Sequence, residues 1–245
     1  MSAAHALQWL ACGWRMFVAQ PVQWLLMSLT AFVVMAIISM FIVPFLPILG
    51  PMAAPVMFVL LTGGMLRVAE RQAAGETLQF RHLLEGMSRH TANLALVGVL
   101  FSIPLVLLHL TIMLAMGGGL LVGVLGVALG SALSGVLSWL ATLLSTILAG
   151  GAIVLVLWLL LILTLIFSPA LIMYRGLSPL DAMGVSLHAS ARNFGPILLF
   201  GLCIYALFVL AMAPLGLGVL IFIPVSVGAL RQAHHDLFAE ATEPA

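Results

Sequence analysis

The 85 residues from His90 to Tyr174 contain no Asp, Glu, Lys or Arg. Two more charge-free segments flank this run, Met16 to Leu66 and Asn193 to Leu230. Only 6% of the whole chain is charged and 64% is hydrophobic, whereas a soluble domain has about 25% charged residues. Because so little polar surface is left to face water, we expect a lipid bilayer to surround most of the chain.

Apolar segments alternate with short polar ones along the chain, and a membrane-spanning helix needs about 20 apolar residues. We therefore predict an all-α polytopic membrane helix bundle with about six transmembrane helices, formed by residues 1–245 as a single membrane domain. Proline-rich or glycine-containing turns at Pro44–Pro51 and Pro214–Gly216 reverse the chain. The expected spans are Val22–Val43, Met52–Leu66, Leu94–Met116, Ala152–Tyr174, Ile197–Ala213 and Leu215–Leu230.

Three polar segments have the periodicity of amphipathic helices, which lie in the membrane interface with one apolar and one solvated face. Ser178-Pro179 gives the third a cap and a proline at its first helical position. In the second, Arg81, Glu85 and Arg89 are spaced to pair along one face. The expected apolar stripes are Leu7, Leu10, Trp14 and Phe17; Leu78, Leu83, Leu84 and Met87; and Leu180, Met183, Leu187 and Phe194.

Each amphipathic segment precedes a predicted hairpin, so the chain reads as one unit used three times. Arg15-Met16-Phe17 precedes Pro21, as Arg192-Asn193-Phe194 precedes Pro196. The distance along the chain from the second amphipathic segment to the third is longer than that from the first to the second. The excess is about the length of one Gly- and Ser-rich segment. We predict pseudo-repeat units at 3–76, 77–177 and 178–233, with an insertion at 117–151 in the second and a polar tail at 234–245.

The arginines predict the topology, because positively charged loops stay cytoplasmic. Both termini are therefore expected in the cytoplasm, and the number of spans is even. The insertion must then return to the side it came from, with a break at Gly130–Gly135, as a re-entrant or half-spanning hairpin. Eight spans, two of them short, are the alternative. The arginines that carry this prediction are Arg15, Arg67, Arg89, Arg175, Arg192 and Arg231.

The expected spans contain one titratable polar candidate, His109, with Thr111 and Ser102 as polar neighbours in the same helix. Polar groups inside a membrane need partners and often mark a functional path. Two interpretations remain open. The three side chains line a path for a solute or protons, or His109 is a neutral histidine bonded to a neighbouring helix.

Small residues recur at four-residue spacing through the insertion, and such stripes allow helices to approach closely. The stripe packs the insertion internally, or it forms a subunit interface or lines a pore. It also conflicts with a turn at Gly130–Gly135, since a turn would divide the face. The residues are Gly119, Gly123, Gly126, Gly130, Ser134 and Ser138.

Signatures of catalysis and cofactor binding are missing from the sequence, including nucleophile elbows, zinc-protease motifs, phosphate loops and dinucleotide fingerprints. We therefore expect no enzyme activity and no cofactor. We also expect no metal site, because the adjacent histidines of His234-His235-Asp236 diverge by about 100° on a helix. Eight basic and seven acidic residues give no basic face for nucleic acid. Cys12 and Cys203 are expected as free thiols.

The opening Gly13-Trp14-Arg15-Met16-Phe17, followed by Pro21, Trp24 and repeated hairpins, resembles an uncharacterised family of proteobacterial multipass inner-membrane proteins. More distantly the pattern is similar to the membrane domain fused to some glycerophosphodiester phosphodiesterases. The resemblance implies a location in the bacterial inner membrane. It transfers no catalytic residue, since the soluble catalytic domain has no counterpart in this sequence.

Two classes of function remain. The chain is a non-enzymatic scaffold or accessory subunit that works with a membrane protein partner or as a homo-oligomer in the lipid bilayer. Alternatively, it is a channel or transporter for a small solute or lipid, with its path near His109 and the 117–151 insertion.

Overall fold

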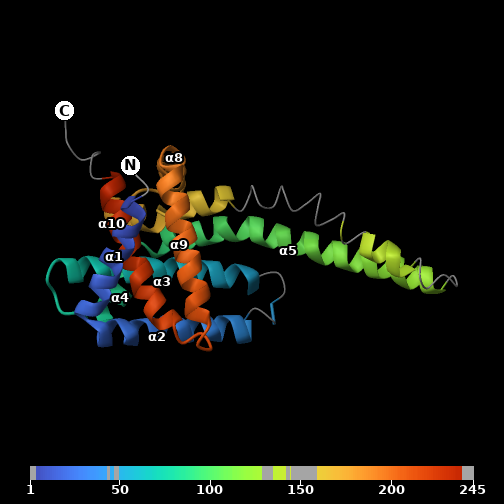
Figure 1. Cartoon of the computed structure of the whole chain (residues 1–245), viewed down its shortest axis with the longest axis horizontal. Helices are drawn as coiled ribbons and strands as arrows, with labels where there is room; N and C mark the ends of the chain where they lie inside the picture. The colour runs from blue at the N-terminus through green and yellow to red at the C-terminus, as the bar shows by residue number, and fades with distance from the viewer. Residues whose placement is uncertain are drawn as a thin grey trace. The chain divides into compact units, whose positions relative to one another are not determined.

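The computed structural model describes residues 4–42, 45–46, 50–128, 135–141, 144 and 159–238, and every regular element among them is helical (Figure 1). The expected all-α class is confirmed. Two compact units are separable, residues 1–100 with 163–245, and residues 101–162. The elements are α1 (Ala4–Ala19), α2 (Pro21–Ile37), the π-helix η1 (Ile38–Ile42), α3 (Gly50–Ala73), α4 (Phe80–Arg89), α5 (Thr91–Ala128), α7 (Ser168–Arg175), α8 (Pro179–Arg192), α9 (Phe194–Met212) and α10 (Val219–Phe238).

Three pairs of helices are joined through a single non-helical residue: α1 to α2 at Gln20, α4 to α5 at His90, and α8 to α9 at Asn193. The three residues have similar backbone angles, with φ/ψ of −144°/65°, −133°/34° and −115°/37°. At His90 the helices on either side differ in direction by 74°. Each predicted amphipathic segment therefore ends in the same local break before the next helix begins.

Local sequence signals explain where several helices begin and turn. Pro21 occupies the start of α2, where a missing N–H is tolerated. The Ser178 hydroxyl accepts a hydrogen bond from the Asp181 N–H at 3.3 Å and caps α8, as predicted. Between α9 and α10 the chain turns with positive φ at Leu215 and Gly216, which confirms the expected turn.

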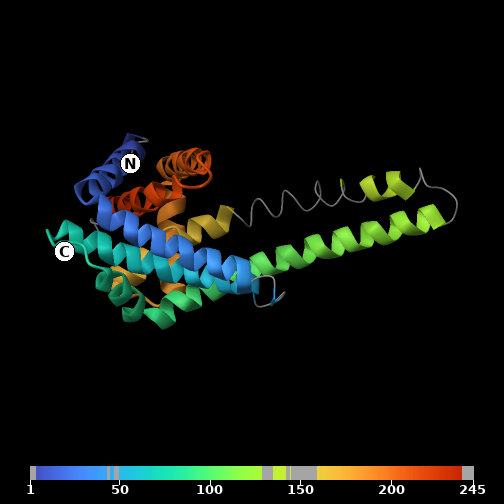
Figure 2. The same cartoon turned by 90° about the horizontal axis from the view of Figure 1, so that it is seen from below.

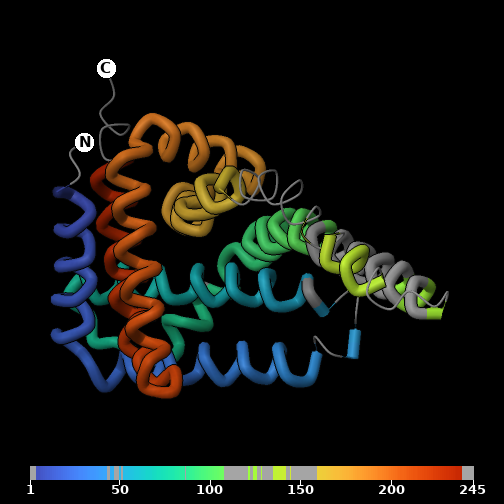
Figure 3. Tube along the Cα trace, turned by 45° about the vertical axis from the view of Figure 1, so that its right-hand side comes forward, coloured from blue at the N-terminus to red at the C-terminus, as the bar shows by residue number. Residues whose placement is uncertain are grey.

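The helix before each break packs on the last helix of another hairpin. α1 lies along α10, α4 along α3, and α8 along α7. The helices α3, α7 and α10 also contact one another. Figures 1 and 3 show α1, α9 and α10 running alongside one another, with α2 and α3 running across them. Figure 2 shows α2 beside α3. The compact unit formed by residues 1–100 and 163–245 thus contains two sets of helices that cross.

Three described helices are long and apolar enough to cross a membrane, Pro21–Ile42, Met52–Ala73 and Phe194–Met212. A fourth is added if the bent pair Phe80–Arg89 and Thr91–Leu107 is one span. Pro21–Ile42 and Phe194–Met212 are each only 22% buried, so their apolar side chains face outward. This composition is that of a membrane protein, and the number of six spans stays a prediction.

The expected span Leu94–Met116 lies within a longer helix. α5 continues without a break from Thr91 to Ala128, through the glycines at 117–119. Its 38 residues measure about 57 Å at a rise of ~1.5 Å per residue, which exceeds one crossing of a bilayer core. The expected turn at Gly130–Gly135 lies outside the described residues except for Gly135, which is helical.

The faces of the amphipathic helices that pack inside the protein coincide only in part with the apolar stripes. Phe17 of α1 and Leu83 of α4 are buried, whereas the exposed fractions of Leu7 and Trp14 are 59% and 52%, and Leu84 and Leu180 are also exposed. Exposed apolar side chains are compatible with the expected position of these helices in the membrane interface. Small residues make up much of the face that packs inside the protein. The buried residues are Ala6, Trp9, Gly13 and Phe17 in α1, and Pro179, Ala182, Ser186 and Ser190 in α8.

Candidate polar site at the ends of α3, α7 and α10

The carboxyl-terminal ends of α3, α7 and α10 meet around Tyr174, the penultimate residue of α7. Its hydroxyl donates a hydrogen bond to the carbonyl oxygen of Leu66 in α3 at 3.1 Å. Its ring lies 5.0 Å from the ring of His234 and 6.3 Å from that of His235, both in α10. Tyr174 therefore ties α7 to both of its neighbours.

Three arginines surround this junction. Arg175 donates from Nη2 to the carbonyl oxygen of Phe238 at 2.6 Å and places its guanidinium 5.4 Å from the Phe238 ring centre, which complements the negative end of the α10 dipole. Arg67 pairs with Glu70 at 2.7 Å. The Nε of Arg231 is buried, with no hydrogen-bond partner among the described residues. Positive charge therefore gathers where the three helices end.

His234 is the most deeply buried titratable group of the junction, with an exposed fraction of 5%. Neither ring nitrogen has a hydrogen-bond partner in the described part of the chain. Burial lowers the pKa of His234 to about 4, and the charges of His235, Arg175 and Arg231 act in the same direction. The imidazole is therefore neutral at pH 7.

Helix α1 closes the other side of α10 through a chain of polar contacts. Trp9 donates from Nε1 to Asp236 at 2.7 Å, and Gln232 donates to the other carboxylate oxygen at 2.8 Å. The Cys12 thiol lies 3.5 Å from the Gln232 side-chain oxygen. We call this set the α10 cluster; it comprises Trp9, Tyr174, Arg175, Arg231, Gln232, His234, His235 and Asp236.

A glycine pair allows α1 to approach α10 this closely. A Cβ atom on Gly13 would lie 2.1 Å from the carbonyl oxygen of Val225, and one on Gly228 would lie 2.8 Å from the Cα of Gly13. Real side chains do not tolerate either distance, so only glycine fits at this crossing. The register that pairs Trp9 with Asp236 depends on this crossing.

A second polar set lies where α3 ends against α2 and α4. Trp24 donates to the Gln72 side chain at 2.8 Å, Arg71 pairs with Glu76 at 2.7 Å, and Arg71 lies 3.5 Å from Glu85. The hydrogen bond from Arg71 lowers the pKa of Glu76. We call this set the α3 cluster; it comprises Gln20, Trp24, Arg71, Gln72, Glu76, His82 and Glu85.

One expectation about this region is corrected, and one buried residue is new. Glu85 pairs with Arg71 of α3 rather than with arginines of its own helix. His82 of α4 has an exposed fraction of 2% and accepts a hydrogen bond from the Gln79 N–H at 3.4 Å. Both follow from the packing of α4 on α3, which turns part of the polar face inward.

The intramembrane candidates are only partly placed. His109 and Thr111 lie in α5, with side chains outside the described set, whereas Ser102 is fully buried. Gly119, Gly123 and Gly126 lie on α5, Ser138 is helical and exposed, and Gly130 and Ser134 are not described. The two interpretations of this stripe therefore remain predictions.

The topology arginines fall into two groups. Arg67 and Arg231 both act electrostatically on Tyr174, and Arg175 acts on His234, so three belong to the junction. Arg15, Arg89 and Arg192 are exposed, on α1 and at the ends of α4 and α8. Spacing alone predicted neither grouping, because it depends on contacts between distant segments.

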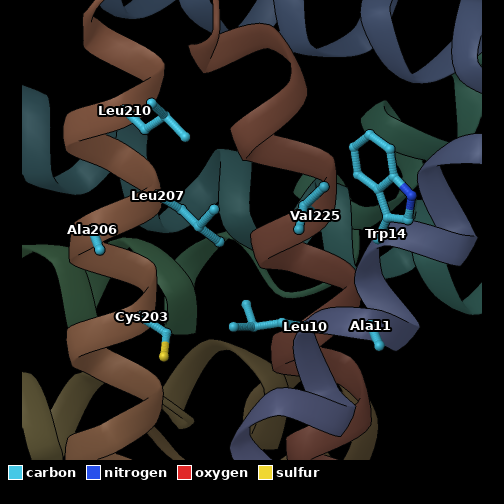
Figure 4. A pocket seen from close by; sticks show the side chains of 8 residues that line it. All are labelled: Leu10, Ala11, Trp14, Cys203, Ala206, Leu207, Leu210 and Val225. Atoms are coloured by element: carbon cyan, nitrogen blue, oxygen red, sulfur yellow. The ribbon is translucent and has the colours of Figure 1, made fainter.

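The described residues hold no group of three or more His, Cys, Asp and Glu placed to bind a metal ion, and within the same residues Cys12 and Cys203 are free. An apolar groove of about 540 Å³ lies between α1 and α9, with Val225 of α10 also lining it. Figure 4 shows Leu10 and Leu207 in the space between these helices. Its lining is apolar apart from the Cys203 thiol.

The sequence alone did not identify Trp9, Gly13, Tyr174 or Gly228 as structural anchors. A usable signal was present in α1, where Ala6, Trp9, Gly13 and Phe17 recur at helical spacing beside the larger apolar stripe. No family model, curated protein or solved structure matches this chain. The resemblance to proteobacterial inner-membrane proteins therefore stays a prediction.

Proposed function

We propose that this protein is a non-enzymatic scaffold or accessory subunit of a membrane assembly. The observation that carries this proposal is the use of its polar side chains, which tie helices to one another. Inside a membrane such ties fix helix positions. They join α1 to α10 (Trp9–Asp236), α2 to α3 (Trp24–Gln72), α7 to α3 (Tyr174–Leu66) and α8 to the helix before α7 (Ser186–Leu163).

The proposal includes three units and six spans. The similar breaks at Gln20, His90 and Asn193 support the repeat. So does the packing of each preceding helix on the last helix of another hairpin. Helix α1 of the first pseudo-repeat packs on α10 of the third, so the first and last pseudo-repeats are in contact.

The proposed location is the bacterial inner membrane, with both termini in the cytoplasm. The arginine distribution supports this orientation, and the resemblance of the opening residues supports the location. A reporter fused after Gly176 should read cytoplasmic. A periplasmic reading would contradict the even number of spans.

Cysteine labelling at position 109 tests scaffold against channel. In a Cys12→Ser, Cys203→Ala background, His109→Cys in native membranes should resist a water-soluble maleimide, because a scaffold needs no aqueous path there. Gln79→Cys is the matched control, since Gln79 is exposed before α4 and should label fully. Rapid labelling at position 109 would instead support a conduit.

Purification tests the scaffold directly. The full chain, extracted in a mild detergent, should retain a membrane protein partner or a second copy at constant stoichiometry through two columns. Quantitative mass spectrometry and light scattering measure the ratio. A monomer that never retains a partner would contradict the proposal.

A further inference from the structure

Two polar side chains of α10 have unmet hydrogen-bonding capacity at the junction of α3, α7 and α10. Both ring nitrogens of His234 and the Nε of Arg231 are buried without partners in the described part of the chain. The residues are three positions apart and so lie on one face of the helix. Buried polar groups are nearly always bonded to protein, water or an ion, so this face is built to meet an acceptor.

The charges around this face leave it positive. Arg175 and Arg231 act on His234, and Arg231 and Arg67 act on Tyr174. The two nearby acids are already engaged. Glu70 pairs with Arg67 at 2.7 Å, and Asp236 accepts hydrogen bonds from Trp9 and Gln232. Because Glu70 neutralises Arg67, an incoming anion would meet the charges of Arg175 and Arg231, which neither carboxylate pairs with among the described residues.

The geometry of the groups favours a phosphate. A guanidinium presents Nε and a terminal nitrogen along one edge, which matches two oxygens of a phosphate. A neutral imidazole adds one N–H donor, and a protonated one adds two. Burial is the main cause of the lowered pKa of His234, and His235, Arg175 and Arg231 add to it. A bound anion would oppose these positive charges, so binding and protonation of His234 are coupled.

We propose that Arg231 and His234 bind a phosphate group, supplied by an anionic phospholipid headgroup or by free phosphate. The headgroup source rests on the proposed topology, in which the last span ends at Leu230 and Arg231 lies at headgroup depth. Basic sites between helices at this depth bind anionic headgroups. The binding chemistry itself rests only on the cluster.

The test uses the full-length protein in a neutral detergent, titrated separately with inorganic phosphate and with dihexanoylphosphatidylglycerol. Isothermal titration calorimetry measures the affinity in every variant, and NMR of the His234 ring measures the pKa where His234 is present. The pKa of His234 should rise on binding, and the affinity should fall about tenfold in Arg231→Gln and in His234→Gln, as expected for loss of one hydrogen bond to a charged group. Arg192→Gln removes the same charge at an exposed position and should change the affinity less than twofold.

The two titrations separate the sources. Saturation by phosphatidylglycerol alone identifies the headgroup, and saturation by both ligands at similar concentrations identifies phosphate in general. If Arg231→Gln unfolds, Arg231→Lys keeps the charge and removes the fork, and should still weaken binding. Equal affinities in Arg231→Gln, Arg231→Lys and Arg192→Gln, with no shift of the His234 resonance, would overturn the proposal. Because no membrane is used, a wrong topology leaves this result valid.

Discussion

The α3 and α10 clusters occupy corresponding places, each at the carboxyl-terminal end of the second helix of a hairpin. In each a buried tryptophan donates to a side-chain oxygen, Trp24 to Gln72 and Trp9 to Asp236. The α3 cluster pairs its charged groups with one another and leaves the Nε of Arg71 without a partner among the described residues, whereas the α10 cluster leaves both ring nitrogens of His234 and the Nε of Arg231 without one. The α3 cluster is therefore mainly an ion-paired contact between helices, and the α10 cluster carries more unmet hydrogen-bonding capacity.

The largest expected effect is on the contact that assembles the α10 cluster. Gly13→Ala places a Cβ against the carbonyl oxygen of Val225, where it would lie 2.1 Å away. α1 must then move off α10, and the free energy of unfolding should fall by about 3 kcal/mol. Circular dichroism during SDS titration of the detergent-solubilised protein measures it.

The matched control is Gly184→Ala in α8, where a Cβ has nothing within 4 Å. This variant should be neutral or slightly more stable, because alanine favours helix. Equal losses in the two variants would show that α1 does not lie against α10 as described.

The two tryptophan ties should differ in strength. Trp9→Phe removes a hydrogen bond to a carboxylate and should lower the free energy of unfolding by about 2 kcal/mol, whereas Trp24→Phe removes one to a neutral amide and should lower it by about 1 kcal/mol. Adding Asp236→Asn to each variant sharpens the comparison. Asp236→Asn should have a smaller further effect in Trp9→Phe, where only the bond from Gln232 remains, and its full effect in Trp24→Phe.

The buried histidines should respond with opposite signs. His234→Phe replaces an unsatisfied polar ring with an apolar one and should raise the free energy of unfolding in lipid-free detergent by about 1 kcal/mol. His82→Phe removes the acceptor for the Gln79 N–H and should lower it by a similar amount. A loss in both variants would mean that His234 is already satisfied within the fold.

The pH dependence checks the same contrast. The pKa of His234 is lowered from 6.5 to about 4 in the fold, so the unfolded chain binds more protons between these values. The free energy of unfolding is therefore highest above pH 6.5, where His234 is neutral in both states, and it decreases as the pH falls from 6.5 toward 4. His234→Phe should flatten this part of the profile, leaving the smaller slope from His235, whose pKa is also lowered. The lowered pKa of Glu76 acts only below its ordinary value of 4.5.

Local signals in the sequence predicted the helical class, the Ser178 cap and the turn after α9. They did not predict which face of α1 or α8 is buried. In water the large apolar stripe would turn inward, but in lipid it has no such preference, so close packing selects small residues such as Gly13 and Ser186. The α10 cluster could not be predicted from the sequence either, because Trp9 and Asp236 meet only through tertiary structure.

The smallest expected effect tests whether charge alone distinguishes the clusters. Arg71 and Glu85 are 3.5 Å apart with 32% and 44% of their side chains exposed, and such pairs contribute about 0.5 kcal/mol or less. Glu85→Gln should therefore lower the free energy of unfolding less than Trp24→Phe does. In 0.5 M NaCl the Glu85→Gln variant should be as stable as the unchanged protein, since the Debye length falls well below ~10 Å. A larger loss would mean that the ion pairs hold α4 on α3. A small loss leaves the neutral Trp24–Gln72 hydrogen bond and the packing of α4 as the contacts that hold α3, so that the buried, unpaired ring of His234, rather than the amount of charge, separates the α10 cluster from the α3 cluster.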